Sequence, residues 1–532
     1  MKIRTLMICL SMFWILSSCK KSDMIVNSDQ GTESLINVTH DTAYVSNQPR
    51  NLNLIYFVPN DLDTLPSYEK RLSELMLWTQ NYFKNEMNRN GYGYKTFGLF
   101  KDSVINRVKI ITIRGTLPKT SYPYTNGASA VQSEINAYFS THPDEKTSDH
   151  TLVIIPRYSF KTDGTPSGGP FYGLGKWCFA LDYEGLDITN LGKSDADGNR
   201  FSVWFGGLVH ELGHGLNLPH NCQKVSENAT LGMALMWAGN GTLGKSPTFL
   251  TAADCAILNV NQIFNNNTAT YYGAVTAGIS RIHADYSSTK NAIVVSGKFT
   301  TNTPINSVLY YNDPNVNNEG TGTNKDYNAT TWESKVIGTD SFYVEMPVSE
   351  FKYKDSSPYE MKVKLVAENG TVKETIYNYK WIDALPVLEF GTKNEISKAG
   401  WSIAAYSSQQ TTAPAVNIID NNTGSGWHSQ YSVSPAATYP HYITIDMGSA
   451  HTLKGFTIQN GASRPIKNAD ILYSTDGVNF VSQASYVIAK SSSKQNFTFN
   501  TPLTFRYFKI VPQSSWDGQV FAQIAEIGFF TD

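Results

Sequence analysis

Hydrophobic and polar residues follow two different periods in the first half of the chain. Short runs rich in β-branched and aromatic residues predict strands, and longer stretches with apolar residues three or four positions apart predict helices. The predicted strands span residues 52–58, 108–113, 151–155 and 177–181, with 151–155 at the centre of the sheet. The predicted helices span residues 67–90, with Ser67 as N-cap, 128–139 and 205–216. This alternation is typical of an α/β (α+β) domain, which we place at residues 49–277.

The pattern changes near residue 275, beyond which every predicted element is a strand. Residues 278–385 contain alternating runs between turn signals, which predicts an immunoglobulin- or fibronectin-like β-sandwich that acts as a spacer. Residues 386–532 form a third predicted domain, again all-β, and a linker is expected at 382–386. The predicted strands beyond residue 275 are 292–295, 307–311, 342–346, 361–366, 441–447, 452–459, 470–474, 507–511 and 524–530.

The first 19 residues have the pattern of an export signal. Two basic residues precede an apolar run from Leu6 to Leu16, which is too short to span a bilayer comfortably. The segment Leu16–Cys19 resembles the bacterial lipobox, which implies a lipoprotein signal peptide at residues 1–19 and lipidation of Cys19. Residues 20–48 are polar and are interpreted as a tether. Lys20, rather than an aspartate, follows the cysteine, which resembles the outer-membrane sorting of Gram-negative lipoproteins, so we expect a lipid-anchored protein of the outer membrane that faces outward.

Composition narrows the class of protein. The chain has 532 residues, with 43 basic and 45 acidic side chains, and its net charge of −2 excludes a strongly basic surface for nucleic acid. Five cysteines are too few for a disulfide scaffold. Cys178, Cys222 and Cys255 follow the export signal, and this odd number allows one bridge at most, for which Cys222 and Cys255 are the predicted pair.

One short segment carries the chemistry. His210 and His214 lie four positions apart on a predicted helix, so both imidazoles can reach the same ion, and His220 completes an HExxHxxNxxH motif. Three histidines with an open fourth position are typical of catalytic zinc. Glu211 is placed beside that position as a general base. At Asn217 the chain must leave the helix, and asparagine is the residue that best replaces glycine in the left-handed conformation this requires.

This motif resembles that of the metzincin zinc endopeptidases, HExxHxxGxxH. The resemblance implies that His210, His214 and His220 bind Zn²⁺ and that Glu211 assists the attack of a zinc-bound water on a peptide bond. It also implies a methionine turn below the metal, for which Met236 is the candidate and Met233 the alternative. No tyrosine follows this turn closely, so a tyrosine as a fifth ligand is not expected.

Residues near the motif leave further alternatives open. Trp177–Leu181 is either the edge strand on which a peptide substrate lies or an ordinary strand of the sheet. Asp182 and Glu184 are either partners of the metal site or surface charges, and we expect surface charges.

Four segments near the C-terminus resemble the coagulation factor 5/8 type C (discoidin) family. They are Ile418–Trp427, His441–Gly448, Tyr473–Gly477 and Arg506–Ile510. The resemblance implies an eight-stranded β jelly roll. In bacterial surface proteins such modules are usually binders of galactose-type carbohydrates.

The same resemblance implies ligands for Ca²⁺, an ion that prefers oxygen donors. The corresponding residues are Asp420, Asn422 through its backbone, Ser425 and Glu526. A sugar site needs an aromatic face and a few polar side chains, and the loop residues that offer them are His428, Arg464 and Trp516.

These features predict a surface-anchored zinc endopeptidase that hydrolyses peptide bonds in mucin-like glycoproteins. Its expected partners are a protein or glycoprotein substrate and a glycan held by the C-terminal module. The membrane is reached only through the lipid anchor, and no nucleic acid is involved. The alternative is a carbohydrate-binding surface adhesin with an inactive or non-peptidase zinc domain, against which the intact Glu211 argues.

Overall fold

The structure is a computed structural model that describes residues 44–531, except 315–325, 356–357, 389, 391–392, 394 and 491–493. The predicted signal peptide, its Cys19 and most of the predicted tether lie outside the described residues. Within the described ranges, no helix combines the length and the apolar character needed to cross a membrane.

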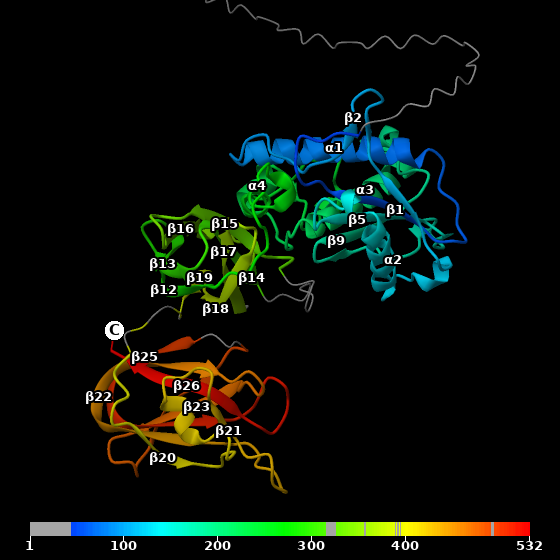
Figure 1. The fold of residues 1–532 in the computed structure, drawn as a ribbon. Coiled ribbons are helices and arrows are strands. Elements are labelled where there is room, and N and C mark those ends of the chain that lie inside the picture. The colour runs from blue at the N-terminus through cyan, green and yellow to red at the C-terminus, as the bar shows by residue number, and fades with distance from the viewer. Residues whose placement is uncertain are drawn as a thin grey trace, which may run out of the picture. The chain divides into compact units, whose positions relative to one another are not determined.

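A five-stranded sheet lies at the centre of the first domain (Figure 1), in the order β4-β1-β5-β9-β8. Its parallel strands are β1 (Asn53–Val58), β4 (Ile111–Arg114), β5 (Thr151–Pro156) and β9 (Trp177–Asp182). The short strand β8 (Gly173–Leu174) is antiparallel and forms the edge. The predicted strands at 52–58, 151–155 and 177–181 are confirmed. The predicted strand at 108–113 is divided between β4 and β3 (Arg107–Val108), which pairs with β2 (Lys101–Asp102).

Helices cover both faces of this sheet (Figure 1). Alternate side chains of the strands point to opposite faces. Leu54 and Leu152 belong to the apolar cluster shared with α1 (Tyr68–Arg89) and α3 (Ala196–Gly215). The neighbouring residues Ile55 and Val153 pack with α2 (Gly127–Thr141). The domain is therefore a three-layer α/β arrangement, and all three predicted helices are present.

Shorter elements complete the first domain. The remaining described α-helices are α4 (Val225–Thr230) and α5 (Ala252–Asn259). Besides β2, β3 and β8, the described two-residue strands are β6 (Ser159–Phe160), β7 (Pro166–Ser167), β10 (Met233–Ala234) and β11 (Thr248–Phe249).

The structure decides two local points in this domain. Ser67 occupies the N-cap position of α1 as predicted, but it has a left-handed backbone with φ of 52° and makes no side-chain capping hydrogen bond. Of the two alternatives for Trp177–Leu181, the ordinary strand of the sheet is the observed one, because β8 pairs with the outer side of β9 at Gly173 and Leu174.

Asp182 is not a surface charge. It is fully buried at the end of β9 and forms a two-pronged ion pair with Arg71 of α1, at 2.8 and 3.0 Å. The hydroxyl of Tyr56 donates a further hydrogen bond at 2.9 Å to the same carboxylate. This pair ties α1 to the sheet. Glu184 is about half exposed and pairs with Arg157 at the surface, as predicted.

The second domain consists of two antiparallel sheets packed face to face. One sheet contains β12 (Ala277–Ser287), β13 (Ala292–Thr301) and β16 (Ser341–Pro347). The other contains β15 (Thr330–Lys335), β14 (Ile305–Pro314), β17 (Pro358–Ala367), β18 (Val372–Ile382) and β19 (Leu385–Val387). Apolar residues from both sheets, among them Val295, Tyr310 and Trp381, form one core. The predicted sandwich is therefore confirmed.

The predicted linker at 382–386 is instead a hairpin of this sandwich. Asp383 and Ala384 both adopt left-handed conformations, with φ of 50° and 59°. Two successive residues of this kind make a tight turn that matches the twist of paired strands. Ile382 and Leu385 consequently face each other as the first pair of β18 and β19.

The sandwich is also more than a spacer. Leu309, Tyr311, Ala329 and Val366 of the sandwich belong to the same buried apolar cluster as α1 and α3. The backbone N–H of Cys222 donates to the carbonyl of Ala329 at 2.9 Å. The first two domains therefore share a core.

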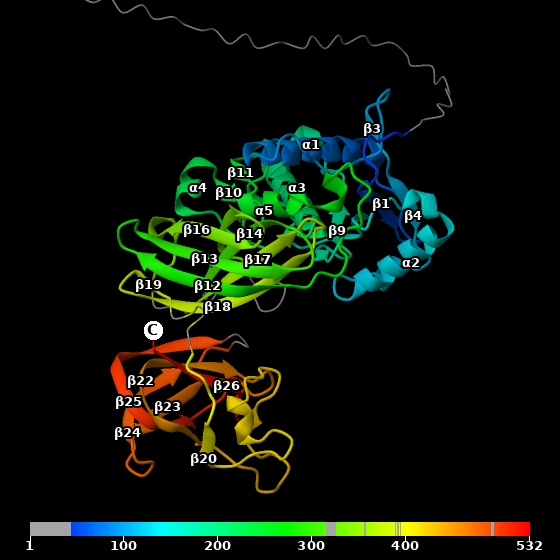
Figure 2. The same cartoon turned by 60° about the vertical axis from the view of Figure 1, so that its left-hand side comes forward.

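The C-terminal domain is a jelly roll of antiparallel strands (Figure 2). Its described strands are β21 (Trp427–His428), β26 (Gln523–Phe530), β22 (Ile443–Asn460), β25 (Gln495–Pro512), β23 (Asn468–Ser474), β24 (Val481–Val487) and β20 (Ser402–Tyr406). The described residues thus form seven strands rather than eight. The reason is that β22 runs through two predicted strands, with register shifts that bend it instead of breaking it.

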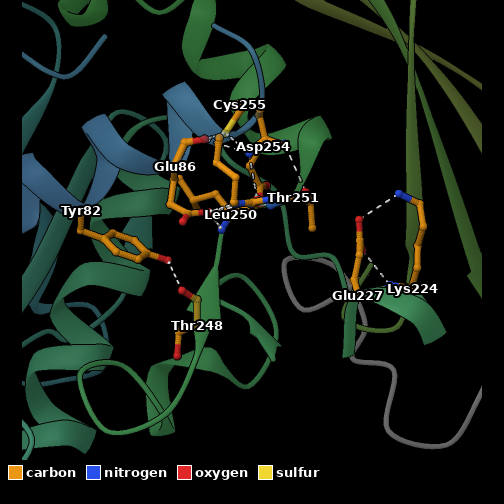
Figure 3. Close-up of polar contacts among 11 residues, drawn as sticks. Tyr82, Glu86, Lys224, Glu227, Thr248, Leu250, Thr251, Asp254 and Cys255 are labelled. Atoms are coloured by element: carbon orange, nitrogen blue, oxygen red, sulfur yellow. Dashed lines mark hydrogen bonds and ion pairs between the residues drawn. The ribbon is translucent and has the colours of Figure 1, made fainter. Parts of the chain in front are cut away.

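The predicted disulfide between Cys222 and Cys255 is wrong. Cys178, Cys222 and Cys255 are all buried free thiols. The Cys222 thiol donates to the carbonyl of Asn328 in the sandwich at 3.1 Å. The Cys255 thiol instead lies beside Glu86 of α1, whose carbonyl it contacts at 3.7 Å (Figure 3). The two thiols face different elements, which their sequence positions could not show.

The buried pair gives the first prediction. Asp182→Asn leaves the Arg71 guanidinium buried without its counter-charge, and we expect a loss of about 3–5 kcal/mol in the free energy of unfolding, measured by urea denaturation. Glu184→Gln is the matched control, because it breaks an exposed pair and should cost at most about 1 kcal/mol. Equal effects of the two substitutions would contradict the structural role of Asp182.

Thiol titration gives a second prediction. In the chain from Lys20 onward, an aromatic disulfide reagent should label none of the three cysteines within minutes in the native state, because all three are buried. After unfolding in guanidinium without a reductant, it should label all three. Labelling of only one thiol under those conditions would show that the other two are joined in a disulfide.

Candidate active site

The three histidines of the motif meet at the C-terminal end of α3. His210 and His214 lie one helical turn apart on the same face of this helix, and His220 follows the turn after it. One ring nitrogen of each lies within 4.8 Å of one ring nitrogen of the other two. The Nε2 atoms of His214 and His220 are 3.0 Å apart. Among the described residues, this is the one cluster of histidine, cysteine and acidic side chains with the spacing of a metal site.

Backbone carbonyls orient two of the imidazoles. His210 Nδ1 donates to the carbonyl of Leu235, and His214 Nδ1 donates to that of Leu218, both at 2.8 Å. A carbonyl can only accept, so the protons sit on Nδ1 and the Nε2 lone pairs face the cluster. Burial lowers the pKa of His210 to about 4 and also lowers the pKa of His214. Both rings are therefore neutral at pH 7, the form that binds a metal.

The helix ends as predicted. Asn217 has a φ of 73°, and the N–H of Leu218 returns to the carbonyl of Gly213 at 3.0 Å. His150, which sequence analysis did not select, holds the same end in place. Its Nδ1 donates to the carbonyl of Gly215 at 2.7 Å, and its Nε2 accepts from the hydroxyl of Tyr272 at 2.6 Å. Burial lowers the pKa of His150 to about 4, so the ring is neutral in this role.

Glu211 lies between α3 and the edge strand β8. Burial raises the pKa of its carboxyl to about 7, although the backbone N–H of Gly173 donates to it. Gly173 also permits the close approach of β8 to the helix, because a Cβ there would lie 2.3 Å from the Cβ of His214. The edge strand, Glu211 and His214 therefore meet at one place.

Met236 lies against the helix between the first two histidines. Its side chain is fully buried, and a Cβ on Gly213 would come within 2.5 Å of its sulfur. Leu235, which orients His210, is its neighbour in the chain. Met233 is half-buried on β10, where its sulfur accepts from Gln223 at 3.6 Å.

The residue after His220 is fixed by a buried polar contact. Asn221 donates to Asp254 at 2.6 Å, and Asp254 also accepts from the backbone and the hydroxyl of Thr251 (Figure 3). Thr251 and Asp254 form the capping box of α5. The start of α5 therefore determines where the third histidine lies.

A tyrosine from the sandwich completes the surroundings of the histidine cluster. The ring of Tyr327 is stacked on that of His220, with 3.7 Å between centroids and 19° between planes. Sequence analysis missed this residue because it belongs to another domain, far along the chain.

The residues predicted to hold calcium lie around one loop of the C-terminal domain. The carboxylate of Asp420 accepts from the backbone of Asn422 and from the hydroxyl of Ser425. Glu526 is buried and accepts from the backbone N–H of Asn421 at 3.4 Å. Glu526 is also ion-paired with Lys398, so a cation at this carboxylate would have to displace that ammonium group.

The predicted sugar-site residues occupy neighbouring loops. His428 on β21 is paired with Gln523 on β26. The backbone N–H of Gln523 donates to the carbonyl of Arg464, and the backbone N–H of Trp516 donates to the carbonyl of Pro465, which follows Arg464. Arg464 is paired with Asp517, and Trp516 is about a third exposed.

Two aromatic residues that sequence analysis missed lie beside His428. The ring centroids of Tyr431 and Phe521 are 4.8 and 6.1 Å from that of His428. Tyr431 is half exposed, so this group offers the aromatic surface that a sugar ring requires.

Comparison with known proteins gives two regions of similarity. A family model described as F5/8 type C domain matches residues 402–527. Over 139 residues the chain is 31% identical to a sialidase of Micromonospora viridifaciens, and over 145 residues it is 28% identical to galactose oxidase of Gibberella zeae. These matches cover 25% of this chain, which spans only about a fifth of the length of these curated relatives.

The second region is similar to solved structures of OgpA from Akkermansia muciniphila. Wild-type OgpA is 35% identical, with a TM-score of 0.59 over 63% of this chain and 94% of that chain. A catalytically inactive OgpA, crystallised in complex with an O-glycopeptide substrate, is 33% identical, with a TM-score of 0.60 over 67% of this chain and all of that chain. The chain therefore belongs with OgpA by fold and sequence over most of its length, and it carries an F5/8 type C domain at residues 402–527.

Proposed function

We propose that this protein is a zinc-dependent endopeptidase that hydrolyses peptide bonds in O-glycosylated, mucin-like proteins. The observation that carries the proposal is the convergence of His210, His214 and His220 beside Glu211. The similarity to OgpA supports the substrate class, because inactive OgpA was crystallised with an O-glycopeptide substrate.

The residues present fit zinc. His210, His214 and His220 would hold the ion, since their ring nitrogens converge and the first two have Nε2 free of protons. Neutral imidazole nitrogens are preferred zinc donors, and three protein ligands leave a position for water or substrate. When bound, zinc lowers the pKa of a coordinated water and polarises the scissile carbonyl.

Glu211 is the proton carrier of the proposed reaction. Its carboxylate takes the proton of the attacking water and then delivers it to the amine of the leaving peptide. A pKa near 7 suits both steps, because the group can accept and release a proton at neutral pH. The N–H of Gly173 holds the carboxylate toward β8.

We propose that the substrate peptide binds along the edge strand β8. An extended peptide can add to a free sheet edge through backbone hydrogen bonds, which places its carbonyls in register along the strand. Leu174 is about half exposed on this edge, and Gly173 contacts the general base. This assigns to β8 the role that sequence analysis considered for residues 177–181.

The C-terminal module has a separate proposed role. We assign it the binding of galactose-type glycans through the loops of His428, Arg464 and Trp516, with calcium at the Asp420 loop as a structural ion. The anchoring of the mature chain through lipidated Cys19 at the outer membrane stays a prediction. Together these would keep the peptidase close to glycosylated substrates.

The central test is proteolysis of an O-glycosylated mucin peptide by the chain from Lys20 onward. Glu211→Gln should lower kcat by about 10²- to 10⁴-fold while zinc still binds at one equivalent, because this substitution removes the proton acceptor and leaves the imidazoles in place. A chelator should abolish cleavage, and added zinc should restore it. Product formation is followed by mass spectrometry.

The control substrate is the same peptide without its sugars. Cleavage that is unaffected by deglycosylation would contradict the proposed substrate class but not the peptidase. A wild-type protein that binds zinc and cleaves none of the glycoproteins tested would favour the adhesin.

A further prediction concerns the glycan face. His428→Ala should weaken the binding of galactose-terminated glycans about tenfold, measured by calorimetry, because it removes both a polar contact and part of the aromatic group. His451→Ala is the matched control, because this partly exposed histidine of the same module lies on β22 and has a side-chain hydrogen bond with Ser449. Unchanged binding by His428→Ala would place the sugar site elsewhere.

A further inference from the structure

We propose that Tyr327, a residue of the sandwich, is a positioning residue for the metal ligand His220, so that the sandwich is part of the catalytic unit. The inference rests on the zinc site proposed above. The ring of Tyr327 lies flat on His220, at 3.7 Å and 19°. A contact over the whole face of an imidazole restricts its rotation but leaves the edge that carries the nitrogens open.

One of the three histidines has a ring contact that comes from the sandwich. His210 and His214 each donate a hydrogen bond through Nδ1 to a carbonyl of their own domain. His220 is in addition covered by an aromatic ring from another domain. The position of the third ligand therefore depends on how the sandwich docks.

Buried charges hold Tyr327 in place from the side of the sandwich. Its neighbour Asp326 is buried in a left-handed conformation, with φ of 76°. The carboxylate of Asp326 is ion-paired with Lys362 and Lys364 of β17, which are both buried. Lys362 also pairs with Asp313 at 2.6 Å. A non-glycine residue in this conformation needs such compensation from its surroundings.

Hydrogen bonds from the first domain hold the same segment on its other side. Cys222, two residues after His220, donates its N–H to the carbonyl of Ala329 at 2.9 Å and its thiol to that of Asn328 at 3.1 Å. Ala329 is fully buried in the shared apolar core. The segments 220–222 and 326–329 therefore form one continuous contact, and each is fixed by the other.

The hydroxyl of Tyr327 has no part in this arrangement. Within the described ranges it has no hydrogen-bond partner, and it is the ring that contacts His220. A phenylalanine should therefore fill the same role, whereas a small side chain should not. This difference separates a positioning role of the ring from chemistry of the phenol.

The test compares zinc binding by Tyr327→Ala, Tyr327→Phe and the wild-type chain from Lys20 onward. We expect Tyr327→Ala to raise the zinc dissociation constant about 10- to 100-fold in competition with a chromogenic chelator, the range typical of lost support around a ligand. With cobalt(II) in place of zinc, its visible absorption bands should shift or lose intensity. Tyr327→Phe should match the wild type in both measurements.

A matched control separates the metal site from domain docking in general. Tyr92→Ala removes another contact between the first domain and the sandwich, because the Tyr92 hydroxyl donates to Glu333 at 2.5 Å and its ring lies under Lys335. Its contacts across this interface are with Glu333 and Lys335 and not with the histidine cluster, so zinc affinity should stay within about threefold of the wild type.

The outcomes distinguish a failure of the positioning role of Tyr327 from a failure of the proposed zinc site. Unchanged zinc affinity and cobalt spectrum in Tyr327→Ala would overturn the inference, and so would an equal loss in Tyr92→Ala. A wild-type chain that binds no zinc would instead defeat the proposed function. If Tyr327→Ala does not fold, as judged by circular dichroism, Tyr327→Leu keeps the bulk without the aromatic face and should show the same weakened zinc binding.

Discussion

The close packing of helix α3 is the constraint on which the rest of the site depends. The helix approaches its neighbours at places where a side chain would not fit. A Cβ on Gly213 would meet the sulfur of Met236 at 2.5 Å, and one on Gly215 would meet the sulfur of Cys178 at 2.7 Å. The sheet on one side and Met236 on the other therefore fix both the height and the rotation of the helix, and with them the direction of His210 and His214.

This close packing also determines the electrostatics of the site. Burial makes the charged forms of the histidines unfavourable, so the pKa of His210 falls to about 4 and that of His214 falls as well. The same burial raises the pKa of Glu211 to about 7. Neutral donors and a carboxyl able to exchange its proton near neutral pH thus arise from one cause, the exclusion of water around the end of α3.

The sequence predicts well what is local. The spacing of His210, Glu211 and His214 needs only the period of a helix, and the left-handed turn at Asn217 follows from the few residues that tolerate it. Long-range partners could not be predicted in this way. The sequence alone predicts Asp182 to be a surface charge, because its partner Arg71 belongs to another element. Tyr327 has no signal in the sequence, because its contact with His220 comes from the packing of two domains.

The shared core also explains how the chain divides into functional parts. The similarity to OgpA spans 94–100% of the OgpA chains and 63–68% of this chain. The first two domains make up a similar fraction of this chain. The F5/8 type C domain at 402–527 instead matches curated relatives over only about a fifth of their length, as expected of a module that joins different proteins. Because Ala329 is buried among residues of the first domain while Tyr327 covers His220, the sandwich could not be exchanged in the same way without disturbing the histidine cluster. The α/β domain and the sandwich therefore form one structural unit, and the F5/8 type C domain is a separate module beside it.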